Sequence, residues 1–163
     1  MVRFAVLTSS DMGAAGKRED KSGDIAVELM EAEGHTLIER AIVPDEKPRI
    51  IEQLRIWCFS GEIDVVLTTG GTGLGPRDVT PEATAEVVDR EVPGMAEAMR
   101  AGSLKITPMA MTSRALAGVR AGTLIINLPG SPGGVRDNLG VVMPVLEHAV
   151  EILQDKHRGS HPV

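Results

Sequence analysis

The feature that most constrains the fold is the alternation of short, strand-like apolar runs with segments of helical pattern. Strand-like runs cover residues 3–7, 37–43 and 63–69, and helical patterns cover residues 22–33 and 47–60 between them. Two strands joined through a helix run parallel in the same sheet. Because parallel sheets are covered on both faces, we predict a three-layer α/β/α fold with a mostly parallel sheet.

The second half of the chain continues the helical pattern. One helix is predicted to start at Pro81, with Thr80 as its N-cap, because proline suits the first helical position and threonine suits the cap. A longer helical stretch covers residues 132–154, and we expect a break near Gly140 or Pro144.

A hairpin interrupts the parallel pattern. Residues 117–119 and 123–128 are strand-like and are separated by a turn at residues 121–122. The short hairpin would give the sheet an antiparallel edge.

A further helix is predicted over residues 93–105.

Length and composition favour one domain. The chain has 163 residues, with 42% hydrophobic and 25% charged residues, which is typical of a globular protein with a single core. We predict one α/β domain over residues 1–154 and a flexible tail over residues 155–163.

Several classes of protein are disfavoured. No apolar run approaches the roughly 20 residues of a membrane span, and polar residues 8–11 end the apolar N-terminal stretch too early for a signal peptide. The single cysteine, Cys58, excludes an internal disulfide and is compatible with a reducing cytoplasm. The net charge of −6 argues against nucleic acid as a partner.

The glycine-rich segment 68–82 follows directly after a buried strand. Four glycines within residues 70–75 allow positive φ and let backbone N–H groups approach an anion. The loop lacks the lysine of a Walker A motif and the spacing of a dinucleotide fingerprint. The alternative is a glycine-rich turn without a ligand. If the segment does bind phosphate, the residues that we expect to contact it are Thr69, Gly70, Gly71, Thr72 and Gly73.

Charged residues flank this loop. Arg77 and Asp78 stand at its mouth, where they could act as a phosphate clamp and a magnesium ligand, or simply form a local ion pair. Asp45 follows the second strand and should lie at the same edge of the sheet. Taken alone, Asp45 is typical of an N-cap for the helix near Lys47. Paired with Asp78, it would be a second carboxylate for Mg²⁺.

Two more loops are expected at that edge. Residues 127–134 contain Ser131 followed by Pro132, a helix start that could bind an anion or could be only a capped turn. The polar segment 9–23 is long for a strand–helix connection, as binding loops and lids often are. Four basic residues are candidates to contact a phosphate group because of their positions on predicted loops: Arg77, Lys105, Arg114 and Arg136.

Together these segments resemble the Mog/MoaB family of molybdenum cofactor proteins, which includes the adenylyltransferase domains of gephyrin-type proteins. The resemblance covers residues 3–153, and its most specific part is the run from Thr-Thr-Gly-Gly-Thr-Gly to Arg-Asp-Val-Thr-Pro-Glu over residues 68–82. The supporting matches are Val43–Glu46, Arg90–Gly94, Ser103–Pro108 and Asn127–Gly130.

The resemblance implies the molybdopterin-binding fold and a reaction that joins AMP from ATP to the phosphate of molybdopterin, releasing pyrophosphate. It implies Mg²⁺ as cofactor, with Asp45 and Asp78 as catalytic and metal-binding residues, and the loop 69–73 as the nucleotide site. It also implies a cytoplasmic homotrimer, paired into a hexamer in some members. The residues that would contact molybdopterin are Ser103, Asn127, Pro129 and Ser131.

Two other functions stay open. A non-catalytic carrier or scaffold of the MoaB type would bind molybdopterin without consuming ATP. The CinA-type nucleotide hydrolases and the molybdenum-insertion proteins have similar glycine loops, but they usually add further domains, for which 163 residues leave no room. The presence of both Asp45 and Asp78 favours an active adenylyltransferase.

Overall fold

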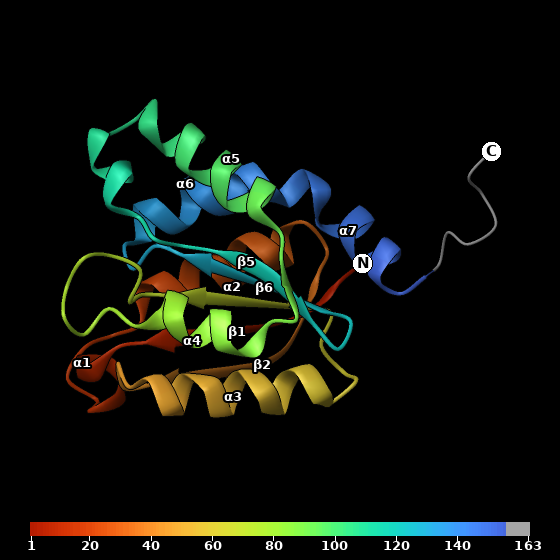
Figure 1. The fold of residues 1–163 in the computed structure, drawn as a ribbon, viewed down its shortest axis with the longest axis horizontal. Helices are drawn as coiled ribbons and strands as arrows, with labels where there is room; N and C mark the ends of the chain where they lie inside the picture. Colours follow the sequence, from red (N-terminus) through yellow and green to blue (C-terminus); the bar gives the residue numbers. More distant parts are fainter. Residues whose placement is uncertain (156–163) are drawn as a thin grey trace.

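A six-stranded sheet forms the middle layer, with the strands in the order β2-β1-β3-β6-β5-β4 (Figure 1). Strands β2, β1, β3 and β6 are parallel, whereas β5 and β4 are antiparallel to their neighbours. This structure is a computed structural model and describes residues 1–155, so the predicted tail lies outside the described residues from 156 onward. The strands are β1 (Arg3–Ser9), β2 (Thr36–Val43), β3 (Val65–Thr69), β4 (Arg90–Glu91), β5 (Ala117–Arg120) and β6 (Thr123–Leu128).

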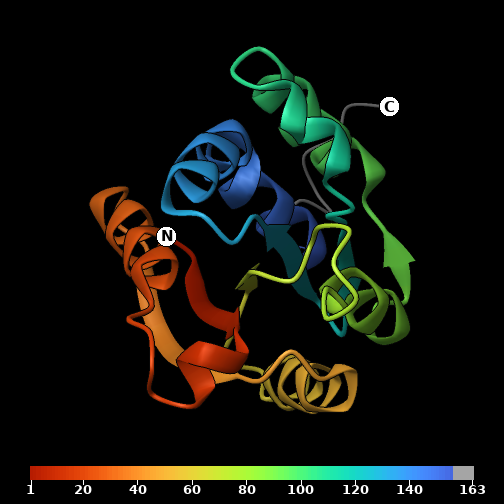
Figure 2. The ribbon, with the colours of Figure 1, turned by 90° about the vertical axis from the view of Figure 1, so that its left-hand side faces the viewer.

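Helices cover both faces of the sheet, as Figures 1 and 2 show. Alternate residues of a strand point to opposite faces. Phe4 and Val6 of β1 therefore pack in the cluster formed with α2, α5, α6 and α7, whereas Ala5 and Leu7 pack with α3 and α4. The helices are α1 (Asp11–Ala14), α2 (Lys21–Ala32), α3 (Lys47–Phe59), α4 (Thr80–Val87), α5 (Pro93–Leu104), α6 (Pro132–Val142) and α7 (Leu146–Leu153), with 3₁₀ turns η1 (Pro108–Thr112) and η2 (Met143–Val145).

The predicted fold class is confirmed. The hairpin formed by β5 and β6 turns at Ala121 and Gly122, which both have positive φ, at 49° and 81°. The hairpin is not itself the edge of the sheet, because the two-residue strand β4 pairs with β5 beyond it. A strand of two residues has no periodicity that a sequence could reveal.

Two predictions about helix ends have different outcomes. The C-terminal helical stretch breaks at η2, which contains Pro144, rather than at Gly140. The prediction that Thr80 caps α4 is wrong: the N-cap is Val79, which makes no side-chain cap bond. The Thr80 hydroxyl instead donates to the carbonyl oxygen of Gly70, 2.9 Å away.

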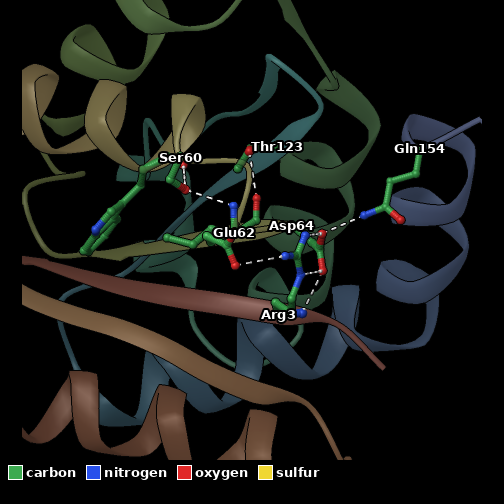
Figure 3. Close-up of polar contacts among 8 residues, drawn as sticks. Arg3, Ser60, Glu62, Asp64, Thr123 and Gln154 are labelled. Atoms are coloured by element: carbon green, nitrogen blue, oxygen red, sulfur yellow. Dashed lines mark hydrogen bonds and ion pairs between the residues drawn. The ribbon is translucent and has the colours of Figure 1, made fainter.

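A polar cluster ties α7 to the amino end of the parallel strands (Figure 3). The buried carboxylate of Asp64 accepts a 2.9 Å hydrogen bond from the backbone N–H of Arg3 and a 2.8 Å bond from its guanidinium. The side-chain amide of Gln154 donates to the same carboxylate at 2.6 Å. This cluster lies at the end of the sheet opposite the glycine-rich loop.

None of the helices within residues 1–155 has the length and apolar character needed to cross a membrane.

Candidate active site

The loops after β1, β2, β3 and β6 converge at the carboxyl end of the parallel strands. The register sets Thr8 beside Thr69 and Thr69 beside Leu128, so these strands end level with one another. The Thr69 hydroxyl donates to the carbonyl oxygen of Pro129 at 2.6 Å. A Cβ added to Gly130 would lie 3.3 Å from the Cα of Gly70, so the loops after β3 and β6 are in direct contact.

A cavity of about 650 Å³ opens between these loops; we call it the carboxylate cavity. It brings together two residues that the sequence singles out, Asp45 and Asp78, with Gly70 and Gly71 of the glycine-rich loop. The remaining lining residues are Thr8, Ser9, Ser10, Gly13, Arg18, Glu19, Asp20, Lys21, Ser22, Thr69, Gly130 and Pro132. The long segment 9–23 therefore forms one wall of this cavity.

Glycine is required at the start of the loop for the packing of the loop itself. Gly70 and Gly71 have φ values of 91° and 69°, in the left-handed region that favours glycine. A Cβ added to Gly70 would lie 2.4 Å from the carbonyl oxygen of Ser9, and one added to Gly71 would lie 2.4 Å from Oγ1 of Thr80. The backbone here passes closer to its neighbours than any side chain permits.

Asp45 is held by the segment that follows β1. Its Oδ1 accepts a 2.7 Å bond from the Ser9 hydroxyl, and its Oδ2 accepts a 2.9 Å bond from the backbone N–H of Asp11. The alternative role as N-cap of α3 is wrong, because that cap is Glu46, which makes no side-chain cap bond. The Asp45 carboxylate is therefore oriented by polar neighbours at the cavity wall.

The carboxylate of Asp78 lies against the backbone of its own loop. Its Oδ2 accepts a 2.9 Å bond from the N–H of Gly75. A Cβ added to Gly73 or Gly75 would approach the same oxygen to 2.9 or 3.0 Å. The glycines of this loop therefore make room for the carboxylate.

Arg77 does not pair with its neighbour Asp78. Its guanidinium makes two bonds to the carboxylate of Asp11, at 3.0 and 2.9 Å. The hydrogen bonds from Arg77, followed by that from the backbone of Asp45, hold the pKa of the Asp11 carboxyl below its usual range. The predicted local ion pair with Asp78 is therefore wrong: the guanidinium of Arg77 pairs instead with Asp11, in the segment after β1.

Sequence reasoning did not single out the buried carboxylate of Asp20 as a centre of contacts. It accepts bonds from the Thr8 hydroxyl at 2.6 Å, from the N–H of Gly23 at 3.0 Å and from the guanidinium of Arg40 at 2.8 Å. Its position before α2 is an N-cap signal that the sequence does carry. The contact with Arg40 of β2 has no local signal, because it depends on the register of the sheet.

A second cavity, of about 370 Å³, lies between α5, η1 and the start of α6; we call it the α5–α6 cavity. Three residues predicted to contact a pterin line it: Ser103, Pro129 and Ser131. The hydroxyl of Ser131 also caps α6, because it accepts a 3.1 Å bond from the N–H of Gly134. The cap that the sequence predicts is therefore confirmed.

The fourth predicted pterin residue, Asn127, lines neither cavity. It is fully buried, and its Nδ2 donates to the hydroxyls of Thr68 and Thr84, both at 2.9 Å. Its Oδ1 accepts a 3.2 Å bond from the N–H of Leu116. In this structure Asn127 joins β3, α4 and the segment before β5.

The two cavities share the same two loops. The glycine-rich loop contributes Gly70 and Gly71 to the carboxylate cavity, and Thr72 and Gly73 to the α5–α6 cavity. In the loop after β6, Gly130 and Pro132 line the carboxylate cavity, whereas Pro129 and Ser131 line the α5–α6 cavity. Molecules bound in the two cavities would therefore approach each other across these loops.

The acidic side chains of the carboxylate cavity suit a hard cation that is shared with substrate. Residues 1–155 contain no group of three or more His, Cys, Asp or Glu side chains that could hold an ion by themselves. Asp45 and Asp78 offer hard oxygen atoms in one cavity, which suits Mg²⁺, because that ion takes one or two carboxylates and completes its shell with water and phosphate oxygens. The same set does not suit a structural zinc, which needs four protein ligands.

Comparison with known proteins decides the family. The family described as "Probable molybdopterin binding domain" matches residues 5–148, which include the glycine-rich loop that both cavities share. The chain belongs to this molybdopterin-binding family.

Members and relatives of the family resemble the chain over most of its length. The Helicobacter pylori protein named "Molybdopterin adenylyltransferase" is 40% identical over 154 residues, covering 93% of this chain and 88% of the relative. The crystal structure of the molybdopterin biosynthesis enzyme MoaB from Thermus thermophilus is 49% identical, with a TM-score of 0.90 over 95% of this chain and 98% of that one.

Some relatives in the family are much longer than this chain. The Drosophila melanogaster "Molybdenum cofactor synthesis protein cinnamon" is 42% identical over 155 residues, or 94% of this chain. The chain spans only 26% of that relative's length. The family match and the similarity to the MoaB structure confirm the family resemblance and the α/β fold class that the sequence predicts.

Proposed function

We propose that the chain is a molybdopterin adenylyltransferase, which transfers AMP from ATP to the phosphate of molybdopterin and releases pyrophosphate. The observation that carries this proposal is the pair of cavities built on the same two loops, one of which contains Asp45 and Asp78. The near full-length similarity to a relative named for this activity supports it.

ATP would bind in the carboxylate cavity. Thr69, Gly70 and Gly71 line the cavity and would face the ATP phosphates, and Thr72 and Gly73 continue the same loop to the other cavity. Arg18 and Lys21, which also line the carboxylate cavity, would offset the charge of the departing pyrophosphate. Both cavities fall in or near the range of about 300–1,000 Å³ that is usual for small-molecule sites. Mg²⁺, held by Asp45 and Asp78, would supply charge neutralisation for the reacting phosphates.

Molybdopterin would bind in the α5–α6 cavity. Ser103, Pro129 and Ser131 would contact it, and its phosphate would point toward Gly73 and the carboxylate cavity. Asn127, predicted as a contact, would act instead by holding Thr68 and Thr84, and thereby the strand that leads into the glycine-rich loop.

The reaction then needs no side-chain nucleophile. An oxygen of the molybdopterin phosphate forms a bond to the α-phosphorus of ATP, and the bond from that phosphorus to pyrophosphate breaks. Transfers of this type depend mainly on positioning and on stabilising negative charge. Ser9, Asp11 and Gly75 contribute by fixing the two carboxylates before the substrates arrive.

The test is a pyrophosphate assay with purified protein, molybdopterin and Mg-ATP. We expect pyrophosphate to form only when molybdopterin is present, in a one-to-one ratio with adenylated pterin. Binding of molybdopterin without pyrophosphate release would instead identify a carrier of the MoaB type. On the family resemblance we also infer a cytoplasmic homotrimer, or a hexamer made of two trimers.

A further inference from the structure

Arg114 holds both ends of the loop that carries Asp78. Its Nε donates to the carbonyl oxygen of Gly73 at 2.8 Å, and its Nη2 donates to the carbonyl oxygen of Asp78 at 2.7 Å. Its backbone N–H donates to the carbonyl oxygen of Thr72 at 2.9 Å. The third nitrogen of the guanidinium, Nη1, pairs with Glu82 of α4.

The loop between Gly73 and Asp78 has little other support. Residues 74–77 are exposed, and the side chain of Leu74 is 71% exposed, so packing does not fix the loop. The remaining ties are the hydrogen bonds between Gly75 and Asp78 and the surface ion pair of Arg77 with Asp11. The Arg77 pair attaches the exposed middle of the loop to Asp11, whereas the bonds from Arg114 fix the carbonyl groups at both of its ends, Gly73 and Asp78.

The position of the Asp78 carboxylate depends on the curvature of this loop. Its Oδ2 is bonded to the N–H of Gly75, whose place is set by the two loop ends. The planar guanidinium presents N–H groups in a fixed fork, so one side chain can hold two carbonyl oxygens in a defined relation. A lysine ammonium cannot reproduce that geometry.

We propose that Arg114 is a positioning residue for adenylyl transfer: by holding the carbonyls of Gly73 and Asp78, it sets where the Asp78 carboxylate lies in the carboxylate cavity. Arg114 itself lines neither cavity, and it directly follows Thr112 and Ser113, which line the α5–α6 cavity. The proposal rests on the proposed function for its kinetic consequence, but not for its structural one.

The kinetic test compares Arg114→Lys with a matched control, Arg120→Gln. The side chains of Arg114 and Arg120 are both 35% exposed and both pair with a carboxylate. Arg120 pairs with Asp89 and lies over the ring of Phe59, and it lines neither cavity. We expect Arg114→Lys to lower kcat at least about tenfold, with KM for ATP and for molybdopterin within about threefold of wild type. Arg120→Gln should keep the wild-type kcat.

A second variant separates the bonds to the carbonyls from the ion pair. Glu82→Gln removes the charged partner of Arg114 but keeps both carbonyl bonds, so its kcat should stay within about threefold of wild type. If Glu82→Gln lowers kcat as much as Arg114→Lys does, the ion pair is responsible and the proposal is overturned.

Hydrogen exchange supplies a readout that needs no turnover. In Arg114→Lys, the amide of Gly75 should exchange at least about tenfold faster than in wild type, whereas Arg120→Gln should leave it unchanged. If wild type forms no adenylated pterin while this difference is seen, the proposed function fails and the positioning role stands. Wild-type kcat and wild-type Gly75 exchange in a folded Arg114→Lys would overturn the proposal.

Discussion

Asp11 and Asp45 exchange hydrogen bonds: the carboxylate of each accepts the backbone N–H of the other, at 2.9 Å in both directions. Asp11 also holds the guanidinium of Arg77. Through this one residue, the loops after β1, β2 and β3 are joined at the mouth of the carboxylate cavity.

This junction should be sensitive to acid. Because the folded-state pKa of Asp11 is lowered, its contribution to stability is complete above the unfolded pKa and is lost as pH falls through the folded pKa. We expect the melting temperature of wild type to exceed that of Asp11→Asn near neutral pH, and the difference to shrink as the pH falls below about 4. Thermal scans from neutral to acidic pH measure this difference in melting temperature. A difference that does not change with pH would show that ionisation of the Asp11 carboxylate does not stabilise the fold.

Replacing Gly71 should weaken ATP binding, and backbone strain alone should not account for the loss. Gly71→Ala places a methyl group 2.4 Å from Oγ1 of Thr80 and 3.5 Å from Oδ1 of Asp45. Gly122→Ala is the matched control, with a φ of +81° and no atom within 4 Å of the new Cβ. Both should lose about 1–2 kcal/mol of stability from the left-handed backbone. Calorimetry should find weakened ATP binding only in Gly71→Ala, and equal affinities in the two folded variants would contradict the role of the loop.

Asp78→Asn should separate binding from chemistry. The variant keeps the shape of the side chain but loses the charge, and the loss of one well-placed electrostatic group typically lowers kcat by about 10²–10³. Molybdopterin affinity should change less than about tenfold, or 1.4 kcal/mol, because three of the four predicted pterin residues, Ser103, Pro129 and Ser131, line the other cavity. Asp89→Asn, which alters a surface ion pair with Arg120, serves as control. Turnover at the wild-type rate in a folded Asp78→Asn would remove Asp78 from the mechanism.

Activity should require a hard divalent cation. Asp45 and Asp78 are carboxylates in a cavity proposed to hold polyphosphate, and no soft ligand accompanies them in the lining. Exhaustive chelation should abolish pyrophosphate release, and added Mg²⁺ should restore it. Full activity in the chelated protein would contradict a role for a metal ion.

The protein should be a trimer in solution at micromolar concentration. This prediction rests on the family resemblance, and closed cyclic symmetry is the usual form of such assemblies. Light scattering measures the mass directly. A monomer across the concentration range would count against the trimeric assembly implied by the family resemblance.

The sequence predicts those parts of the molecule that depend on local pattern. The continuous apolar run before the glycines becomes β3, in which all five residues are buried, and Ser131 followed by Pro132 becomes the start of α6. Asn127 could have been recognised as buried, since it lies inside a strand-like run whose six residues are all buried in β6.

The contacts that organise the site could not be predicted in this way. Arg77 meets Asp11 across 66 residues, and Arg114 meets the carbonyl of Gly73 across 41. Such pairs depend on the order of the strands and on where the loops end. Neither feature produces a periodic pattern of residues in the sequence. The topological rule brings the loops to one edge of the sheet, but only the structure shows which side chains meet there.

The proposed reaction moves the adenylyl group of ATP, with its α-phosphate, to molybdopterin. The most direct test uses two preparations of ATP, one labelled at the α-phosphate and one at the γ-phosphate, each incubated with the protein, Mg²⁺ and molybdopterin. We expect the α label in the pterin product and the γ label in pyrophosphate. Label from the γ-position in the pterin, or α label found only in free AMP, would contradict it.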